Sequence, residues 1–497
     1  MENMMSRRSL VSTCILACLL AWGILSVVAG IDPVFMLALQ MWNFAFVYAI
    51  ANLKRRIMLA AFLLSFFVFL MGGHLTYEYL GMEIKYYLGD EYYRHSNLSM
   101  FISLAFLLTA YYVSELHMNR RNNESAPAAD WEYVNAPATQ VARAVSRWLF
   151  YGAYLFWLYL ILDKASFVST ESYVAYYAEY ESSAPYAIRA IGATAPYFLY
   201  LFLATMPSKR ECGIPLFLYL LYAGISLLTG RRSNLVFMLL FVAVYFVIRD
   251  RIKIRQEKWI TKRLLLTVAI AIPAAVIFLY SYNFIRMNQE IDAGSLPEMF
   301  LGFFQQQGFS SSLMRLEAYY ANVLNSDVYY SFFGLTKWVR TNSLFQAFVD
   351  FEYNFSYLHN SVEFATLGNS LSNSLGYIVL SRAQYLSGVG LGSCYIAELY
   401  HDFGYAGIAV GSTIYGVMMC AVNKVWTFTK PSIWKITLCF GLFESFIKAP
   451  RWNYDIVFSY ALDLGMWAAY GIVALAVWIG SHDKMTRRVP TDLNGNT

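Results

Sequence analysis

The chain has 497 residues, of which 58% are hydrophobic and only 14% are charged. Soluble globular proteins carry charges on about 25% of their residues, so this composition excludes a soluble domain and indicates a polytopic membrane protein. The net charge of +5 does not indicate a nucleic-acid partner. Its Lys and Arg residues cluster in short loops between apolar segments, whereas a nucleic-acid binder carries a basic face on a soluble domain.

Apolar segments recur along the whole chain. A transmembrane helix needs about 20 apolar residues, and on that rule we predict an all-α fold with about twelve spanning helices in a single membrane domain, 1–497. The segments are expected at 9–29, 32–53, 57–74, 98–117, 145–163, 190–206, 213–229, 233–249, 263–284, 395–423, 432–449 and 455–480. The first segment follows Arg7 and Arg8 without a small-residue cleavage site, so we interpret it as an uncleaved helix.

The basic clusters predict the orientation. If about twelve helices alternate, nearly all of these clusters fall on one side, which the positive-inside rule assigns to the cytoplasm. They begin at Arg7, Lys54, Arg120, Lys209, Arg249, Lys424 and Lys484. We therefore predict a multi-pass protein of the inner (plasma) membrane with both termini in the cytoplasm.

Three shorter loops join the early segments. The cytoplasmic stretch 122–140, NNESAPAADWEYVNAPATQ, has no phosphate-binding glycine pattern and no metal-ligand spacing, and is typical of a connector. The outer loops 74–97 and 166–189 are rich in tyrosine. Clustered tyrosines form either an aromatic belt at the membrane surface or a wall on which sugar rings stack, and both interpretations stay open.

The turn 230–233, Gly-Arg-Arg-Ser, contradicts the charge rule. The same alternation places Arg231 and Arg232 on the outer side, between the seventh and eighth segments. A cation on the unfavourable side is a functional hypothesis by default, and arginine binds phosphate oxygens through two parallel hydrogen bonds. The alternative is that both side chains reach lipid headgroups without a specific ligand.

The interval 285–393 is the long polar part of the chain and is predicted to be a large periplasmic loop before the tenth helix. Within it, 300–324 (FLGFFQQQGFSSSLMRLEAYYANVL) spaces apolar residues by three and four, which predicts a partly helical cap in the plane of the membrane surface. Its arginines are candidate contacts for phosphate or sugar: Arg286, Arg315, Arg340 and Arg382.

Acidic residues begin the next helix. Glu398, His401 and Asp402 are spaced by three and four, so they lie on one side of a helical turn and can share hydrogen bonds. Two neighbouring carboxylates perturb each other's pKa, which suits a general base, although an arginine-paired helix cap has the same pattern. Farther on, Glu444 and Lys448 are four apart and are predicted to neutralise each other.

Two of these stretches resemble the Wzy-type O-antigen and oligosaccharide repeat-unit polymerases. They are LLTGRRSNLVF at 227–237 and LSRAQYLSGVGLGSCYIAELYHDFGYAGI at 380–408, where a glycine-spaced run leads into Ala-Glu-Leu-Tyr and Phe-Gly-Tyr. The pattern of about twelve helices with one late outer loop is similar over nearly the full length.

The resemblance implies a membrane glycosyltransferase that joins glycans carried on undecaprenyl pyrophosphate into a surface polysaccharide. Such an enzyme needs cationic donors for the departing diphosphate, a base for an acceptor hydroxyl and an aromatic groove for sugars. We assign the binding of the diphosphate to Arg231, Arg232 and the loop arginines. We assign the role of base to Glu398, His401 or Asp402, and the binding of sugars to aromatic residues such as Tyr400. No cofactor and no metal is expected. The expected partners are the lipid-linked oligosaccharide, membrane lipid, a chain-length regulator and a repeat-unit flippase.

Two other functions stay open. A flippase or exporter of lipid-linked oligosaccharide would carry ionisable residues at mid-membrane and two matched halves. Here the charges gather on one face and no internal repeat is visible. A ligase that transfers finished polysaccharide to another acceptor is scarcely separable from a polymerase by sequence.

Overall fold

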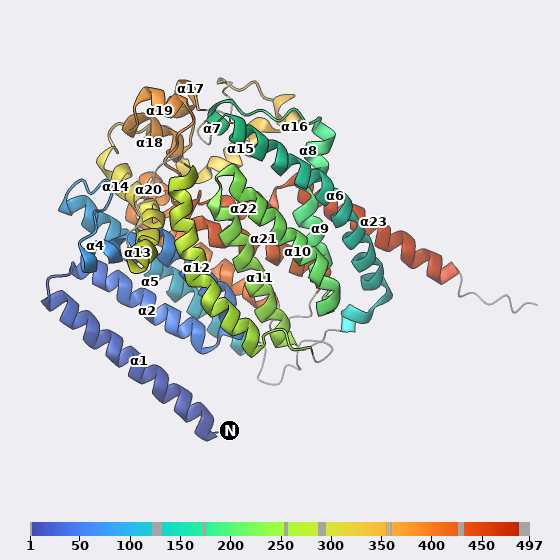
Figure 1. Ribbon diagram of the computed structural model, residues 1–497, viewed down its shortest axis with the longest axis horizontal. Helices are drawn as coiled ribbons and strands as arrows, with labels where there is room; N and C mark the ends of the chain where they lie inside the picture. Colours follow the sequence, from blue (N-terminus) through green and yellow to red (C-terminus); the bar gives the residue numbers. More distant parts are fainter. Residues whose placement is uncertain are drawn as a thin grey trace, which may run out of the picture.

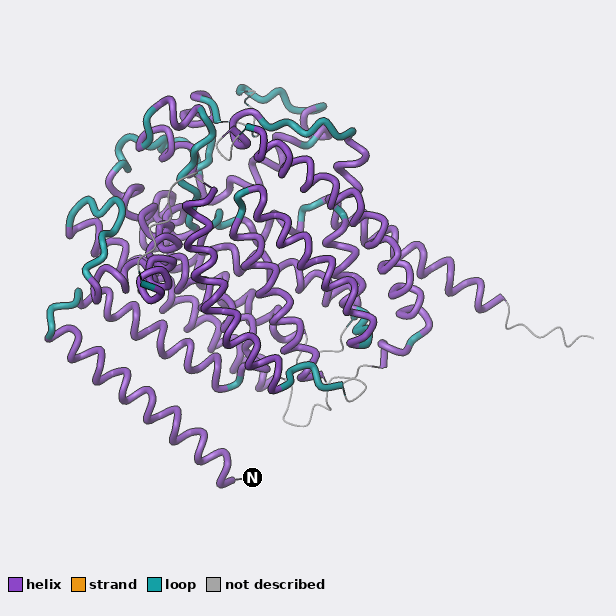
Figure 2. The backbone as a smooth tube through the Cα atoms, viewed as in Figure 1, coloured by secondary structure: helices purple, strands orange, loops and turns teal. Residues whose placement is uncertain are grey.

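The computed structural model describes residues 2–121, 132–171, 175–252, 257–286, 295–353, 355, 357, 360–425 and 432–486. These residues contain helices and no strand (Figure 2), which confirms the all-α prediction. The first ten residues of the predicted connector, 122–131, lie outside the described residues, as do residue 1 and 487–497.

Every predicted apolar segment falls on one or more helices. They are α1 (Glu2–Val28), α2 (Pro33–Ala51), α3 (Leu53–Phe66), α4 (Gly72–Leu80), α5 (Asp90–Arg121), α6 (Pro137–Thr170), α8 (Tyr186–Ala193), α9 (Ala195–Ala204), α10 (Lys209–Ser226), α11 (Arg232–Ile252), α12 (Lys262–Arg286), α20 (Tyr395–Val425), α21 (Ile433–Lys448), α22 (Ile456–Ala461) and α23 (Leu464–Thr486). A short helix, α7 (Ala175–Glu179), lies in the second tyrosine-rich loop.

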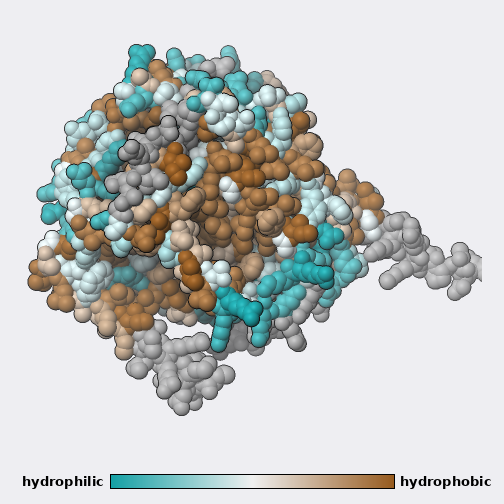
Figure 3. All heavy atoms as spheres, viewed as in Figure 1, coloured by the Kyte–Doolittle hydropathy of each residue, from teal (hydrophilic) through white to brown (hydrophobic). Residues whose placement is uncertain are grey.

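Within the described ranges, nine helices are long and apolar enough to cross a membrane. The polytopic class is therefore confirmed. The predicted segments 9–29, 233–249 and 432–449 are not among these nine, so the count of about twelve stays a prediction. Figure 3 shows hydrophobic side chains over the middle of one face and hydrophilic ones toward its two ends, as a bilayer requires.

The interval after α12 folds into short helices at one end of the bundle (Figure 1). We call residues 295–393 the cap. Its helices are α13 (Leu296–Gln307), α14 (Ser312–Tyr319), α15 (Phe333–Thr341), α16 (Ser343–Gln346), α17 (Val362–Leu367), α18 (Leu371–Val379) and α19 (Arg382–Leu386). The stretch 300–324 is helical over most of its length, as its apolar spacing predicted. Its position in the plane of the membrane surface stays a prediction.

The helix after the cap is not continuous. Gly404 inside α20 has φ 61° and ψ −157°, a backbone conformation that is open in practice only to glycine. The first turns of α20, which carry the acidic motif, are thereby separated from the long apolar part, whose pattern continues to Val425. The break allows these first turns to take a direction of their own beneath the cap.

The long part of α20 packs closely against α5. A buried hydroxyl cluster joins the two helices, because Ser103 Oγ lies 2.6 Å from Tyr395 Oη and 2.9 Å from Ser412 Oγ. Farther along, a Cβ atom added at Gly416 would lie 2.3 Å from the carbonyl oxygen of Leu107. A side chain at position 416 therefore cannot be accommodated without moving the backbone of α5.

Gly416→Ala should consequently destabilise the folded protein by about 1–3 kcal/mol, the usual cost of overpacking a helix contact. Gly471 in α23 is the matched control, because a Cβ atom added there meets no atom within 4 Å. Thermal unfolding of the purified protein in one detergent measures both variants. Equal melting temperatures for Gly416→Ala and Gly471→Ala would contradict the close approach of α5 and α20.

Candidate active site

A cavity of about 1050 Å³ lies between the cap and the adjoining ends of the membrane helices. Its wall includes 83–85, the turn 230–234, 305–309 at the end of α13, part of α15, the start of α18, 388–393 and 451–453. Six Lys or Arg side chains line it against the single carboxylate of Glu83, so the cavity is strongly cationic: Lys85, Arg231, Arg232, Arg315, Lys337 and Arg451.

The arginine turn forms part of this wall. Gly230 has φ 77°, a left-handed conformation that favours glycine and lets the chain turn tightly between α10 and α11. Arg232 Nη1 donates to the carbonyl oxygen of Leu279 at 2.7 Å and to Gln306 Oε1 at 3.3 Å, so this side chain ties the turn to α12 and α13. Arg231 lies over the ring of Tyr176, at 5.2 Å. The structure thus brings both predicted arginines to one cavity.

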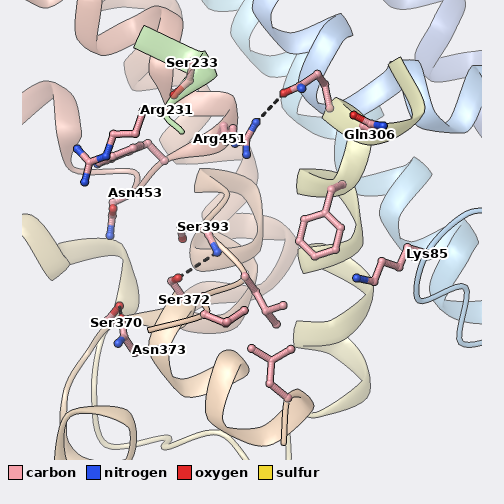
Figure 4. A pocket seen from close by; sticks show the side chains of 18 of the residues that line it. Lys85, Arg231, Ser233, Gln306, Ser370, Ser372, Asn373, Ser393, Arg451 and Asn453 are labelled. Atoms are coloured by element: carbon pink, nitrogen blue, oxygen red, sulfur yellow. Dashed lines mark hydrogen bonds between the residues drawn. The ribbon is translucent and has the colours of Figure 1, made fainter. Parts of the chain in front are cut away.

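Sequence reasoning missed Arg451, Lys85 and Lys337. Arg451 Nη1 donates to Gln307 Oε1 at 2.7 Å. Figure 4 shows Arg231, Ser233, Arg451 and Asn453 toward one end of the cavity, Ser370, Ser372 and Asn373 toward the other, and Lys85 to one side. A signal for Arg451 was present, because its turn after the eleventh segment is on the outer side by the same alternation that singled out Arg231. The other two carry no comparable sequence signal.

Arg315 supports the wall from within. Its side chain is fully buried and donates to the carbonyl oxygens of Tyr86 at 2.9 Å and Lys85 at 3.1 Å, while Nη1 lies 2.9 Å from His74 Nε2. Burial lowers the pKa of Arg315 to about 10. These contacts fix the loop that carries Lys85, so Arg315 holds a basic side chain of the cavity in place.

The glycine-spaced run 388–393 forms a floor of the cavity. Gly388 and Gly392 have φ of 92° and 82°. Asn360 Nδ2 donates to the carbonyl oxygens of Tyr385 at 2.7 Å and Val389 at 3.2 Å, and the amide of Gly392 donates to Ser372 Oγ at 3.1 Å. The cap therefore holds this run in a fixed shape, which suits a binding surface more than a mobile loop.

Glu398 lies directly behind this floor. Its carboxylate is fully buried and accepts from Ser393 Oγ at 2.5 Å and from the amide of Tyr454 at 2.8 Å. Ser393 lines the cavity, and so does Asn453, the neighbour of Tyr454. Glu398 therefore lies behind the cavity wall and contacts it through Ser393 and the segment of Tyr454.

The other two members of the acidic motif have different partners. His401 Nδ1 lies 3.0 Å from Glu317 Oε1 in the cap, and Asp402 accepts from the amides of Tyr330 at 3.0 Å and Ser331 at 2.8 Å. Burial raises the pKa of Glu317. None of the three motif residues lines the cavity, and no hydrogen bond joins any two of them. His401 and Asp402 fasten the cap to α20.

Three further candidates, Arg340, Arg382 and Tyr400, lie away from the cavity wall. Arg340 donates to the carbonyl oxygen of Tyr353 at 3.2 Å, Arg382 begins α19, and the ring of Tyr400 packs 4.2 Å from that of His95. Arg286 ends α12, and its side chain lies outside the described part of the chain. Glu444 and Lys448 form the predicted ion pair, and Tyr200 also donates to Glu444, which confirms that pairing.

The two tyrosine-rich loops pack mainly within themselves. Tyr93 stacks on His74 at 4.8 Å and meets Tyr77 and Tyr87 at 5.2 and 5.6 Å, while Tyr176 and Tyr180 are 5.2 Å apart. Among the tyrosines of these loops whose side chains the structure describes, none is part of the cavity wall. Tyr176 contacts the cavity wall indirectly, because its ring packs against Arg231, which lines the cavity. The choice between a surface belt and a sugar-binding wall stays open for the outer faces of these loops.

Among the described residues, no group of three or more His, Cys, Asp or Glu side chains could hold a metal ion. The fold and the cavity together define a multi-pass membrane protein with a cationic cavity at one end of its helix bundle. The model of one protein family, O-antigen polysaccharide polymerase Wzy, matches residues 10–482. The chain therefore belongs to the Wzy family of O-antigen polymerases, which confirms the resemblance and the assignment to polysaccharide biosynthesis. No curated protein and no solved structure matches the chain.

Proposed function

We propose that the cavity is the place where one lipid-linked glycan is transferred to another on the periplasmic face of the inner membrane. The donor is an oligosaccharide on undecaprenyl pyrophosphate, and the acceptor is the non-reducing end of a second lipid-linked repeat unit. The observation that carries this proposal is the excess of six basic side chains over one acidic side chain in the cavity wall. A diphosphate is the part of these substrates that needs such a site.

The chemistry follows from the donor. The bond between the anomeric carbon and the phosphate oxygen breaks, a bond from the acceptor oxygen to that carbon forms, and the diphosphate leaves with the bonding electrons. Negative charge grows on the leaving group, so cations already held in place lower the barrier. Arg231 and Arg451 supply this charge from one cavity wall (Figure 4), and Arg232 holds the turn 230–234 against α12 and α13. The reaction we propose needs no metal and no further cofactor.

The acceptor hydroxyl must lose a proton during the transfer. Ser393 lines the cavity, and its hydroxyl group donates a hydrogen bond to Glu398. The hydroxyl oxygen of Ser393 can therefore accept a hydrogen bond from the hydroxyl group of the acceptor sugar. We assign to Ser393 the contact with the acceptor hydroxyl and to Glu398 the uptake of the proton through Ser393. This assignment keeps Glu398 in the role predicted from sequence and leaves His401 and Asp402 as positioning residues.

The remaining parts of the proposal concern topology and partners. The cap and cavity face the periplasm if the basic clusters and both termini lie in the cytoplasm. Substrate then arrives already outside, delivered by a repeat-unit flippase, and a chain-length regulator acts on the growing polymer. The turn 230–234, the turn 451–453 and the cap meet at one cavity, which supports a common side for all three.

The lipopolysaccharide of a strain that lacks this chain tests the proposal. We expect core capped with a single repeat unit, and a full ladder when the wild-type chain is restored. Polymer that accumulates on the lipid carrier would instead indicate a ligase, and repeat units trapped in the cytoplasm would indicate a flippase. Either result would contradict the assignment to polymerisation.

A further inference from the structure

The cap side of the cavity differs in chemistry from the arginine side. Phe333, Tyr357 and Phe364 line it as a group, with ring centroids 6.2 Å apart for Phe333–Tyr357 and 5.2 Å apart for Tyr357–Phe364. Asn360, Ser370, Ser372 and Asn373 add neutral polar groups nearby. Aromatic faces beside amides and hydroxyls suit pyranose rings, whose C–H faces are apolar and whose edges bear hydroxyls.

One charged side chain stands in this aromatic part. Lys337 is four residues after Phe333 on α15, so the two share a helix face, and its Nζ lies 5.8 Å from the centre of the Tyr357 ring. The side chain is half-buried and lines the cavity. Within the described ranges, Lys337 forms no ion pair with any carboxylate. Burial lowers the pKa of Lys337, and no acidic group offsets that effect.

A half-buried ammonium with only an aromatic partner is costly in the empty protein, because water is removed without an opposite charge to replace it. An anionic group of the ligand removes that cost when it binds. We assign this anion to a part of the substrate other than the donor diphosphate, because Arg231 directly precedes α11 and Arg451 lies in the turn after α21, whereas Lys337 lies on α15 of the cap, among the aromatic rings. A diphosphate anchored by its lipid tail stays near the membrane, and its sugars extend into the cap.

We propose that the repeat unit contains an acidic sugar and that Lys337 recognises its carboxylate. This inference rests on the proposed function and adds the substrate class to it. The ring of the acidic sugar stacks near Tyr357, and the compact ammonium on its flexible arm reaches the carboxylate at the edge of that ring. Lys337 is then a specificity residue, because an uncharged repeat unit would leave the ammonium unpaired.

Sugar analysis of the polysaccharide made by the native strain is the first test. We expect one carboxylate-bearing sugar, such as a uronic acid, in each repeat unit. A polysaccharide whose repeat unit is wholly uncharged would overturn the proposed role of Lys337. That result would leave the assignment to polymerisation unchanged.

The second test compares two substrates in purified protein. One is the native lipid-linked repeat unit, and the other is the same unit with its carboxyl group reduced to a primary alcohol. We expect Lys337→Gln to slow polymerisation of the native unit by about ten-fold or more, the usual effect of losing one charge-assisted hydrogen bond. The reduced unit should be polymerised equally by wild type and Lys337→Gln, and Lys337→Arg should retain most of the preference for the native unit.

The exposed Lys435 at the start of α21 is the control, and Lys435→Gln should behave as wild type with both substrates. If Lys337→Gln slows both substrates equally, Lys337 acts on the diphosphate or on the fold, and the proposal is overturned. If wild type polymerises neither substrate, the proposed function itself fails, and that outcome is distinct from a loss of preference.

Discussion

Alanine in place of Arg231 or Arg451 should reduce polymerisation by roughly ten- to hundred-fold or more, with the protein still present in the membrane at the normal level. Each guanidinium offers two parallel hydrogen bonds to phosphate oxygens, and the loss of one charge-assisted contact costs about 1.5–3 kcal/mol. Lysine keeps the charge without the planar fork, so Arg→Lys should restore only part of the activity at either position. Glycan ladders at matched membrane abundance measure the effect.

Substitution of Arg232 should affect the stability of the protein as well as its activity. Its guanidinium holds Leu279 of α12 and Gln306 of α13, so Arg232→Ala should also lower the thermal stability of the protein. Arg189 in α8 is an exposed arginine away from the cavity wall and serves as the control. The competing account, in which these arginines only reach lipid headgroups, requires full activity in the lysine variants and near-normal activity in the alanine variants. That pattern would remove them from the active site.

Glu398→Gln should lower the rate of transfer by about 10²–10⁴-fold, the usual contribution of a general base. Glutamine has almost the same shape and can still accept the hydrogen bond from the amide of Tyr454, so the fold should persist. It cannot take a proton from Ser393. Ser393→Ala should give a smaller loss, because a water molecule in the space of the hydroxyl can still reach Glu398. Initial rates with saturating acceptor separate this effect from weaker binding.

Asp402→Asn is the discriminating variant for that assignment. Asp402 is also a carboxylate that accepts backbone hydrogen bonds, but it holds Tyr330 and Ser331 of the cap and touches no cavity residue. We expect it to lower protein stability and to leave the rate per molecule almost unchanged. A rate loss in Asp402→Asn as large as that in Glu398→Gln, with stability unaltered, would move the proton acceptor from Glu398 to Asp402.

The sequence predicts those features of this protein that depend on near neighbours or on the membrane. Helix positions follow from apolar length, and the pair Glu444–Lys448 follows from its spacing. The outer position of Arg231 and Arg232 stays a prediction of the charge rule. Each of these inferences uses residues of one segment and a general constraint on that segment.

The composition of the cavity could not be predicted in the same way. Lys85, Arg231, Lys337 and Arg451 come from four distant parts of the chain, and only the fold brings them together. In the acidic motif, by contrast, residues that are close in sequence have different surroundings. Its spacing placed Glu398, His401 and Asp402 on one side of a helix, yet that side meets a cavity floor, a cap helix and a cap turn in succession. Helical spacing predicts which residues share a face, and the packing of other segments decides what each residue contacts.

Polymerisation by the purified protein in proteoliposomes tests the central claim most directly. The membrane would contain a lipid-linked repeat unit on undecaprenyl pyrophosphate, with EDTA present and no other protein. We expect a ladder of polymer from the wild type and from Arg189→Ala, and no product longer than one repeat unit from Arg231→Ala/Arg451→Ala. A ladder from that double variant equal to the wild-type ladder would show that the cationic cavity is not the site of transfer.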